Sequence, residues 1–151
     1  MGSEMCIRDS LKRAGETYYL STIAALISRA IRDMGRDDDA MVFSRIAEES
    51  AAVDDVESQA LWRSIRAPML ARAGQLLEAE QLARLAVALV QTTDALLMQG
   101  DAACELATVL RLAGQPEESR HSIDAAIAIY NAKGDVVSAA RSRAWRDRLG
   151  R

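Results

Sequence analysis

The sequence predicts an all-α fold made of stacked helical hairpins, and three observations support this prediction. The 151 residues include 28 alanines, 8 glycines and 2 prolines with only 4% aromatic residues, a composition that favours closely packed helices. Three glycines, Gly35, Gly74 and Gly114, lie 39 and 40 residues apart and mark an internal repeat. Between the glycines, apolar residues recur every three or four positions, which is the period of an amphipathic helix.

The three glycines share their sequence surroundings. Each has an aliphatic residue four positions before it, an acid four positions after it, a small residue five positions after it and an alanine twelve positions after it. We expect each glycine to end one helix in the left-handed conformation and the small residues to let the next helix pack closely. The matching sets are Ile31, Leu70 and Leu110; Asp39, Glu78 and Glu118; Ala40, Ala79 and Ser119; and Ala47, Ala86 and Ala126.

The first repeat unit is predicted at 16–52, with helices at 16–34 and 38–52. The first of these helices has an apolar stripe at helical spacing, which predicts its buried face. The run of acids at 37–39 begins the second helix, where negative charge favours the helix N-terminus. A metal site is the alternative for these acids, but the spacing of a calcium loop is missing. The stripe consists of Tyr19, Ile23, Leu26, Ile27, Ala30, Ile31 and Met34.

The second unit, 55–92, and the third unit, 95–133, repeat this pattern, and a closing helix follows at 135–149. Predicted helices cover 55–73, 76–92, 95–113 and 116–133. We expect Asp55, Asp94 and Asp135 to be N-caps, and Pro116 suits the first turn of its helix. Pro68 lies inside the helix at 55–73, where we expect a bend, either tolerated or used as a hinge.

Composition excludes several classes of function. A net charge of −3 with a pI near 5.2 argues against a basic nucleic-acid-binding protein. The sequence contains no run of 18 apolar residues, so we expect no membrane span. Cys6 and Cys104 lie far apart without CxxC spacing, so we expect no disulfide framework, no zinc site and a reducing cytoplasm. The sequence suggests no cofactor.

The first ten residues, MGSEMCIRDS, lack the periodicity of the rest. The string resembles translated sequencing-adapter sequence at the ends of environmental gene fragments. We therefore expect residues 1–10 to be a non-native or disordered terminus, and residues 11–151 to form the helical-repeat domain.

A glycine between paired helices, with small residues five and twelve positions later, resembles the tetratricopeptide repeat. This resemblance covers residues 11–149 and implies a right-handed α-α superhelix of about three and a half units. The repeat here is 39 to 40 residues instead of 34, and the repeat-ending proline is replaced by Ala52, Gln91 and Asn131.

A narrower resemblance starts at Trp62 and Arg63 and continues through TTDAL at 92–96, LRLAGQPEE at 110–118 and the segment from Tyr130 to Arg141. These residues look like the C-terminal repeats of large bacterial regulators that carry a nucleotide cyclase domain and a P-loop ATPase module. The chain has no GxxxxGK[ST] motif, so that chemistry is not expected here. The resemblance implies a non-catalytic scaffold or regulatory module of a signalling protein, with a small-molecule-sensing domain as the alternative.

In tetratricopeptide-like stacks the first helix of each hairpin lines the concave face. Carried over from the glycine register, this implies a basic groove for an acidic protein segment, formed by Arg29, Arg32, Arg72 and Arg111. An ordinary solvated helix face is the alternative. The complete set of groove positions is Thr22, Arg29 and Arg32; Ser64, Ala71 and Arg72; and Asp101, Thr108 and Arg111.

Four further features each have two interpretations. Trp62 and Trp145 either pack in the core or anchor a bound partner. His121, the only histidine, suits a solvated helix face better than a catalytic site because no nucleophile or second histidine accompanies it. The acids at 54–55 suit a helix start better than a metal site, because the ligand spacing of a calcium loop is missing. The arginines of 141–151 suit a cationic helix end, since no aromatic platform for nucleic acid is interleaved with them.

Overall fold

The computed structural model describes residues 17–149, which form seven α-helices and no strand. The prediction of an all-α fold is confirmed, and each helix begins and ends within two residues of its predicted bounds. Residues 1–10, for which we expect a non-native terminus, lie outside the described residues. The helices are α2 (Thr17–Asp33), α3 (Asp37–Ser50), α4 (Val56–Arg72), α5 (Leu76–Val90), α6 (Leu96–Leu112), α7 (Pro116–Lys133) and α8 (Val136–Leu149).

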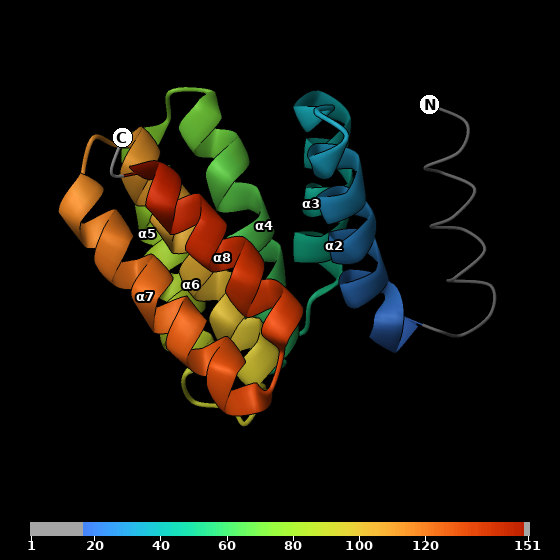
Figure 1. Cartoon of the computed structure of the whole chain (residues 1–151). Coiled ribbons are helices and arrows are strands. Elements are labelled where there is room, and N and C mark those ends of the chain that lie inside the picture. The colour runs from blue at the N-terminus through green and yellow to red at the C-terminus, as the bar shows by residue number, and fades with distance from the viewer. Residues whose placement is uncertain (1–16, 150–151) are drawn as a thin grey trace.

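The helices pair in chain order as the hairpins α2–α3, α4–α5 and α6–α7, and α8 packs against α7 (Figure 1). Helix α4 lies in the middle of the molecule and contacts α2, α3, α5 and α6. This position explains why eleven of the seventeen residues of α4 are buried. No helix within residues 17–149 has the length and apolar character needed to cross a membrane.

The repeated glycines end helices as predicted. Gly35, Gly74 and Gly114 have φ between 75° and 84°, a region that a side chain would strain. The backbone amide of the residue after each glycine donates to the carbonyl of the aliphatic residue four positions before that glycine. An example is the 2.9 Å bond from the Gln75 amide to the Leu70 carbonyl. This bond satisfies a carbonyl that the helix end would otherwise leave free. Gly134 has the same conformation, which the glycine spacing did not predict.

The small residues after each glycine lie where the hairpin helices meet. All six residues of the two predicted sets are fully buried: Ala40, Ala47, Ala79, Ala86, Ser119 and Ala126. In two hairpins a serine hydroxyl also crosses the contact to a backbone carbonyl, from Ser28 to Ala40 at 2.8 Å and from Ser119 to Ala107 at 2.7 Å. Small side chains thus allow close helix packing and backbone-directed hydrogen bonds.

Two of the three predicted N-caps are confirmed. The Asp55 carboxylate accepts from the Ser58 amide at 3.1 Å, and the Asp135 carboxylate accepts from the Ser138 amide at 3.0 Å. The prediction for Asp94 is wrong, because the residue before α6 is Ala95 and no side-chain hydrogen bond caps the start of this helix. Helix α4 continues through Pro68, so this proline does not end the helix.

The predicted buried stripe of α2 is wrong in part. Leu26 and Met34 are 48% and 70% exposed, while the buried face of the helix holds small residues such as Ala24 and Ala25. Alanine and serine let α2 approach α3 closely, so the helix turns this face to its partner and leaves the bulkier side chains outside. The buried residues of α2 are Leu20, Ser21, Ala24, Ala25 and Ser28.

Candidate binding cleft

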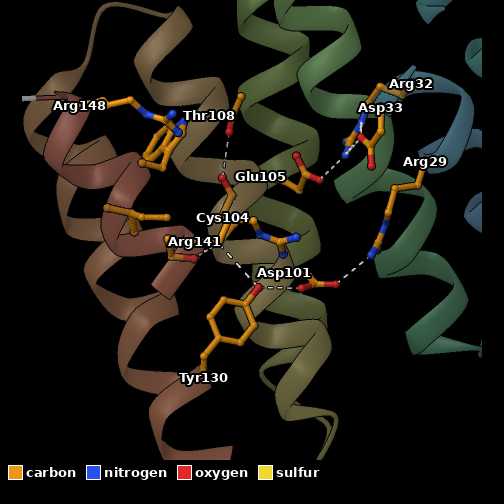
Figure 2. Close-up of a pocket in the computed structure, with 13 residues that line it drawn as sticks. Arg29, Arg32, Asp33, Asp101, Cys104, Glu105, Thr108, Tyr130, Arg141 and Arg148 are labelled. Atoms are coloured by element: carbon orange, nitrogen blue, oxygen red, sulfur yellow. Dashed lines mark hydrogen bonds and ion pairs between the residues drawn. The ribbon is translucent and has the colours of Figure 1, made fainter. Parts of the chain in front are cut away.

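Polar side chains from four helices surround a cleft of about 400 Å³ between α2, α6, α7 and α8, which we call the polar cleft. Helix α6 forms its floor, α2 forms one wall, and α7 with α8 forms the other (Figure 2). The lining residues are Arg29, Arg32 and Asp33 of α2; Asp101, Cys104, Glu105 and Thr108 of α6; Ile123 and Tyr130 of α7; and Arg141, Ser142, Trp145 and Arg148 of α8.

Two arginines of α2 cross to carboxylates of α6 at one side of the polar cleft. Arg29 donates to Asp101 at 2.9 Å, and an Arg32 nitrogen lies 2.8 Å from Glu105. Arg32 also donates to the Ile65 carbonyl of α4 at 3.4 Å and contacts Asp33 at 3.1 Å. The ion pairs therefore link two helices that are not neighbours in the chain, and they hold both guanidinium groups in place.

The Arg32–Glu105 pair is the more enclosed of the two, since its side chains are only 10% and 18% exposed. Burial raises the pKa of the Glu105 carboxyl, because loss of water outweighs the attraction of Arg32. Burial alone would lower the pKa of Arg32, but the charges and hydrogen bonds of Glu105 and Asp33 together raise it. Removing either partner would leave the other ionised group poorly solvated.

A hydrogen-bonded chain continues from the first ion pair across the floor. The Tyr130 hydroxyl donates to Asp101 at 2.7 Å, and the Cys104 sulfur lies 3.7 Å from that hydroxyl and 3.4 Å from the Ser142 hydroxyl. Burial and the bond to Asp101 raise the pKa of Tyr130, and burial raises the pKa of the Cys104 thiol. Both groups are therefore neutral at neutral pH. Figure 2 shows Tyr130 pointing toward Asp101 on the floor of the polar cleft.

Gly100 makes room for the tyrosine in this chain. A Cβ atom at Gly100 would lie 2.6 Å from Cε1 of Tyr130 and 2.9 Å from its Cζ, closer than packed atoms tolerate. The Tyr130 ring is itself almost fully buried. The glycine inside α6 thus has a steric reason and lets Tyr130 reach Asp101.

Helix α8 supplies the two arginines of the polar cleft that contact no carboxylate of the described residues. Arg141 and Arg148 line the polar cleft, and no hydrogen bond or ion pair joins either side chain to another residue within 17–149. Trp145 lies between them in the sequence and lines the cleft from a half-buried position against the α6–α7 core. An unpaired guanidinium beside an aromatic ring is a common feature of anion-binding surfaces.

The structure separates the four arginines expected to form one basic groove. Arg29 and Arg32 line the polar cleft but are paired with carboxylates, and Arg111 stacks over Trp145 with 6.0 Å between its guanidinium carbon and the ring centre. Arg72 lies in a neighbouring depression and makes two bonds to Asp37, at 2.6 and 2.8 Å. The expectation of one basic groove formed by these four arginines is therefore corrected, because acids of the same chain pair with three of them.

Trp62 lies in the core and outside the polar cleft. Its side chain is 3% exposed and belongs to a core cluster with Ile65 and Met69 of the same helix. The guanidinium groups of Arg63 and Arg66 lie 4.2 and 4.5 Å from the ring centre and cover its outer face. The interpretation of Trp62 as a binding anchor is thus wrong, and Trp145 is the tryptophan that faces a cleft.

Glu105 and Tyr130 were not among the sequence candidates, and Arg141 and Arg148 were interpreted only as part of a cationic helix end. One signal could have identified Glu105, because it lies nine residues before Gly114, where the other units have Leu26 and Ile65. A charge at an apolar register position indicates a local change in what that face contacts. Tyr130, Arg141 and Arg148 have no such signal. They lie on α7 and α8, and the glycine register does not show that these helices line a cleft with α6.

The remaining candidates show no arrangement for chemistry. His121 is exposed at the edge of a more apolar groove between α5, α6 and α7. Asp37 and Asp39 pair with Arg72 and Arg36 at the start of α3. Across residues 17–149, no three His, Cys, Asp or Glu side chains gather in a geometry that could hold a metal ion.

No protein-family model, no curated protein and no solved structure matches this chain.

Proposed function

We propose that this chain is a non-catalytic interaction module and that the polar cleft binds an acidic protein segment. The observation that carries the proposal is that Arg141 and Arg148 line the same cleft as Trp145 and form no hydrogen bond or ion pair with another residue of 17–149. Carboxylates of a partner would bond to these guanidinium groups, and an apolar side chain would pack on the indole ring.

The opposite wall supports the same mode of binding. Arg29 and Arg32 are held by Asp101 and Glu105, so they add oriented donors with little remaining freedom to lose. With four arginines and the three acids Asp33, Asp101 and Glu105, the lining has an excess of one positive charge. A segment with spaced acids and one apolar residue matches this distribution better than a uniformly charged one.

Fluorescence anisotropy with a labelled ten-residue peptide rich in Glu and Asp and containing one Leu tests the proposal. The double variant Arg141→Glu/Arg148→Glu is expected to weaken binding at least about tenfold. Arg45→Glu/Arg120→Glu is the matched control, because both arginines are exposed outside the cleft and the net charge changes equally. Equal weakening by both double variants would contradict the proposal, since nonspecific charge would then explain the binding.

A small anionic molecule is the second candidate ligand, and the size of the polar cleft favours it. A volume of about 400 Å³ lies in the range of small-molecule sites, and the bonds joining Arg29, Asp101 and Tyr130 converge there. Thermal-shift measurements with dicarboxylates and nucleotides distinguish the two ligands. A rise in melting temperature that Arg141→Glu/Arg148→Glu abolishes, without peptide binding, would favour the small molecule.

We also propose that the module is part of a larger bacterial signalling regulator of the cyclase and P-loop ATPase type, acting in the cytoplasm. The support is the resemblance of the second and third units, including LRLAGQPEE at 110–118, to tetratricopeptide-like repeats of such proteins. Sequencing the gene upstream of the codon for Leu11 tests this. A P-loop in the same reading frame would support the proposal, and a start codon directly before Leu11 would contradict it.

A further inference from the structure

The outer side of α2 carries an apolar surface that no described residue covers, which we call the α2 end face. It consists of Ile23, Leu26, Ala30 and Met34, which share one side of the helix at i, i+3, i+7 and i+11 spacing. Leu26, Ala30 and Met34 are exposed, and Ile23 is half-buried. Helix α2 therefore has two apolar sides, a small-residue side that packs inside the fold and this bulkier one.

The repeat register shows what happens to the same positions in the second unit. Twelve, nine and five residues before the repeat glycine, α2 has Ile23, Leu26 and Ala30, and α4 has Trp62, Ile65 and Met69. The three α4 side chains are at most 3% exposed. They share one core cluster with alanines of the preceding hairpin: Ala24, Ala25, Ala40 and Ala47. In this unit, the face that corresponds to the α2 end face is an interface with a preceding hairpin.

The third unit follows the same rule at two of the three positions. Ala102 and Val109 of α6 are buried, and they cluster with alanines of the preceding α4–α5 hairpin, including Ala60, Ala67 and Ala79. The third position is Glu105, which lies at the polar cleft. In both the second and the third unit, the preceding hairpin packs on this face of the first helix. Contact with a preceding hairpin is therefore a shared feature of the repeat.

The opposite end of the molecule has a different chemistry. Helix α8 begins with the exposed Val136 and Val137, and over residues 138–148 its exposed side chains are arginines, one aspartate and two alanines. Such a face is typical of the polar terminal unit of a repeat stack. A second copy of this chain is therefore the poorer occupant, because its α8 end offers only Val136, Val137 and two alanines, with arginines between them.

We propose that the α2 end face binds a further helical hairpin of this repeat class. Alanines of that hairpin, at positions equivalent to Ala24, Ala25, Ala40 and Ala47, would cover Ile23, Leu26 and Ala30 as they cover the corresponding residues of α4. This surface is separate from the polar cleft, and the inference does not depend on what the cleft binds.

The probe for the test is the chain's own first unit. Thr17 lies eighteen residues before Gly35, as Val56 lies eighteen residues before Gly74, so a second copy of residues 17–55 inserted before Thr17 keeps the repeat register. Amide hydrogen exchange in the original α2 is expected to slow at least about tenfold in the extended chain, because a side chain such as Leu26 becomes buried. Leu26→Glu in the original α2 should abolish this slowing.

Leu77→Glu is the matched control, because Leu77 is a highly exposed leucine on α5 outside the core clusters. This variant should leave the slowing intact. The proposal would be overturned if exchange does not slow, if Leu26→Glu keeps the slowing, or if the inserted copy adds no helix by circular dichroism. If the chain without the inserted copy forms a dimer, and Leu26→Glu dissociates that dimer, the proposal is overturned and a second copy of the chain covers the α2 end face. Faster α2 exchange after deletion of residues 1–16 would overturn it in favour of that segment.

Discussion

Helices α4 and α6 occupy equivalent places in consecutive repeat units, yet one is a packing element and the other forms the floor of a cleft. Nine residues before the repeat glycine, α4 has Ile65, which is fully buried, and α6 has Glu105, which pairs with Arg32. The two helices have the same length, and each has an alanine as its C-cap, one residue before its repeat glycine. One apolar-to-acidic exchange at a shared position thus changes whether a helix face is filled by neighbours or remains lined by polar groups.

The exchange in α6 is accompanied by others on the same side of the helix. Asp101 and Cys104 correspond to Leu61 and Ser64 of α4, and both belong to the hydrogen-bonded chain of the polar cleft. In α4 the corresponding side is held by hydrophobic burial, whereas in α6 it is held by ion pairs and hydrogen bonds. The two faces should therefore respond differently to the same kinds of substitution.

Introducing the α6 residue into α4 should have the largest effect. Ile65→Glu places a carboxylate among Trp62 and Met69 without a partner, and we expect a loss of more than about 4 kcal/mol in the free energy of unfolding. Urea denaturation followed by circular dichroism measures it. The control Ile65→Val should cost about 1 kcal/mol. A loss under about 2 kcal/mol for Ile65→Glu would show that this face of α4 is not buried.

Removing the acid from α6 should have the next largest effect. Glu105→Ala leaves Arg32 enclosed without its main partner, and we expect a loss of about 2 to 4 kcal/mol. Replacing both residues by leucine should restore stability to within about 1 kcal/mol, because no unpaired charge remains. If Glu105→Ala and Arg32→Ala instead have additive effects in a double-mutant cycle, the two side chains do not interact.

A steric test addresses the floor of the polar cleft. Gly100→Ala should cost about 1 to 3 kcal/mol through the clash with Tyr130, although alanine favours a helix more than glycine does. In a Tyr130→Leu background the same substitution should stabilise by up to about 1 kcal/mol, because only the helix propensity remains. Thermal unfolding measures both, and stabilisation by Gly100→Ala in the parent chain would refute the close contact.

The smallest effect concerns the starts of the two helices. Asp55→Ala should cost about 1 kcal/mol because the cap of α4 is lost. Asp94→Ala should change stability by less than about 0.5 kcal/mol, because Asp94 caps no helix. Chemical denaturation resolves this difference, and equal losses would mean that the α6 start also depends on its aspartate.

Local features of the sequence predicted the helices because their causes are local. The left-handed glycines, the caps at Asp55 and Asp135 and the small contact residues all act within about twelve positions of one another. The polar cleft could not be predicted this way, because Arg29 and Asp101 are 72 residues apart and their pairing depends on how three helices pack.

The wrong burial prediction for α2 and the alternatives left open for the two tryptophans have a related cause. Helix α2 has two apolar sides, and the sequence does not indicate that the side with Ala24 and Ala25 meets α3. Trp62 and Trp145 have similar sequence contexts, but α4 lies between two hairpins whereas α8 ends the described stack. Position within the stack therefore decides the exposure of residues that look equivalent.

Amide chemical-shift mapping by nuclear magnetic resonance, during titration with the acidic ten-residue peptide, tests most directly whether α6 differs from α4 because it forms a binding cleft. The account predicts concentrated shifts at residues 101–108 and 141–148, the floor and one wall of the polar cleft, and unchanged signals at residues 61–65. Shifts spread evenly over exposed arginines, or centred on the groove between α5, α6 and α7, would contradict it.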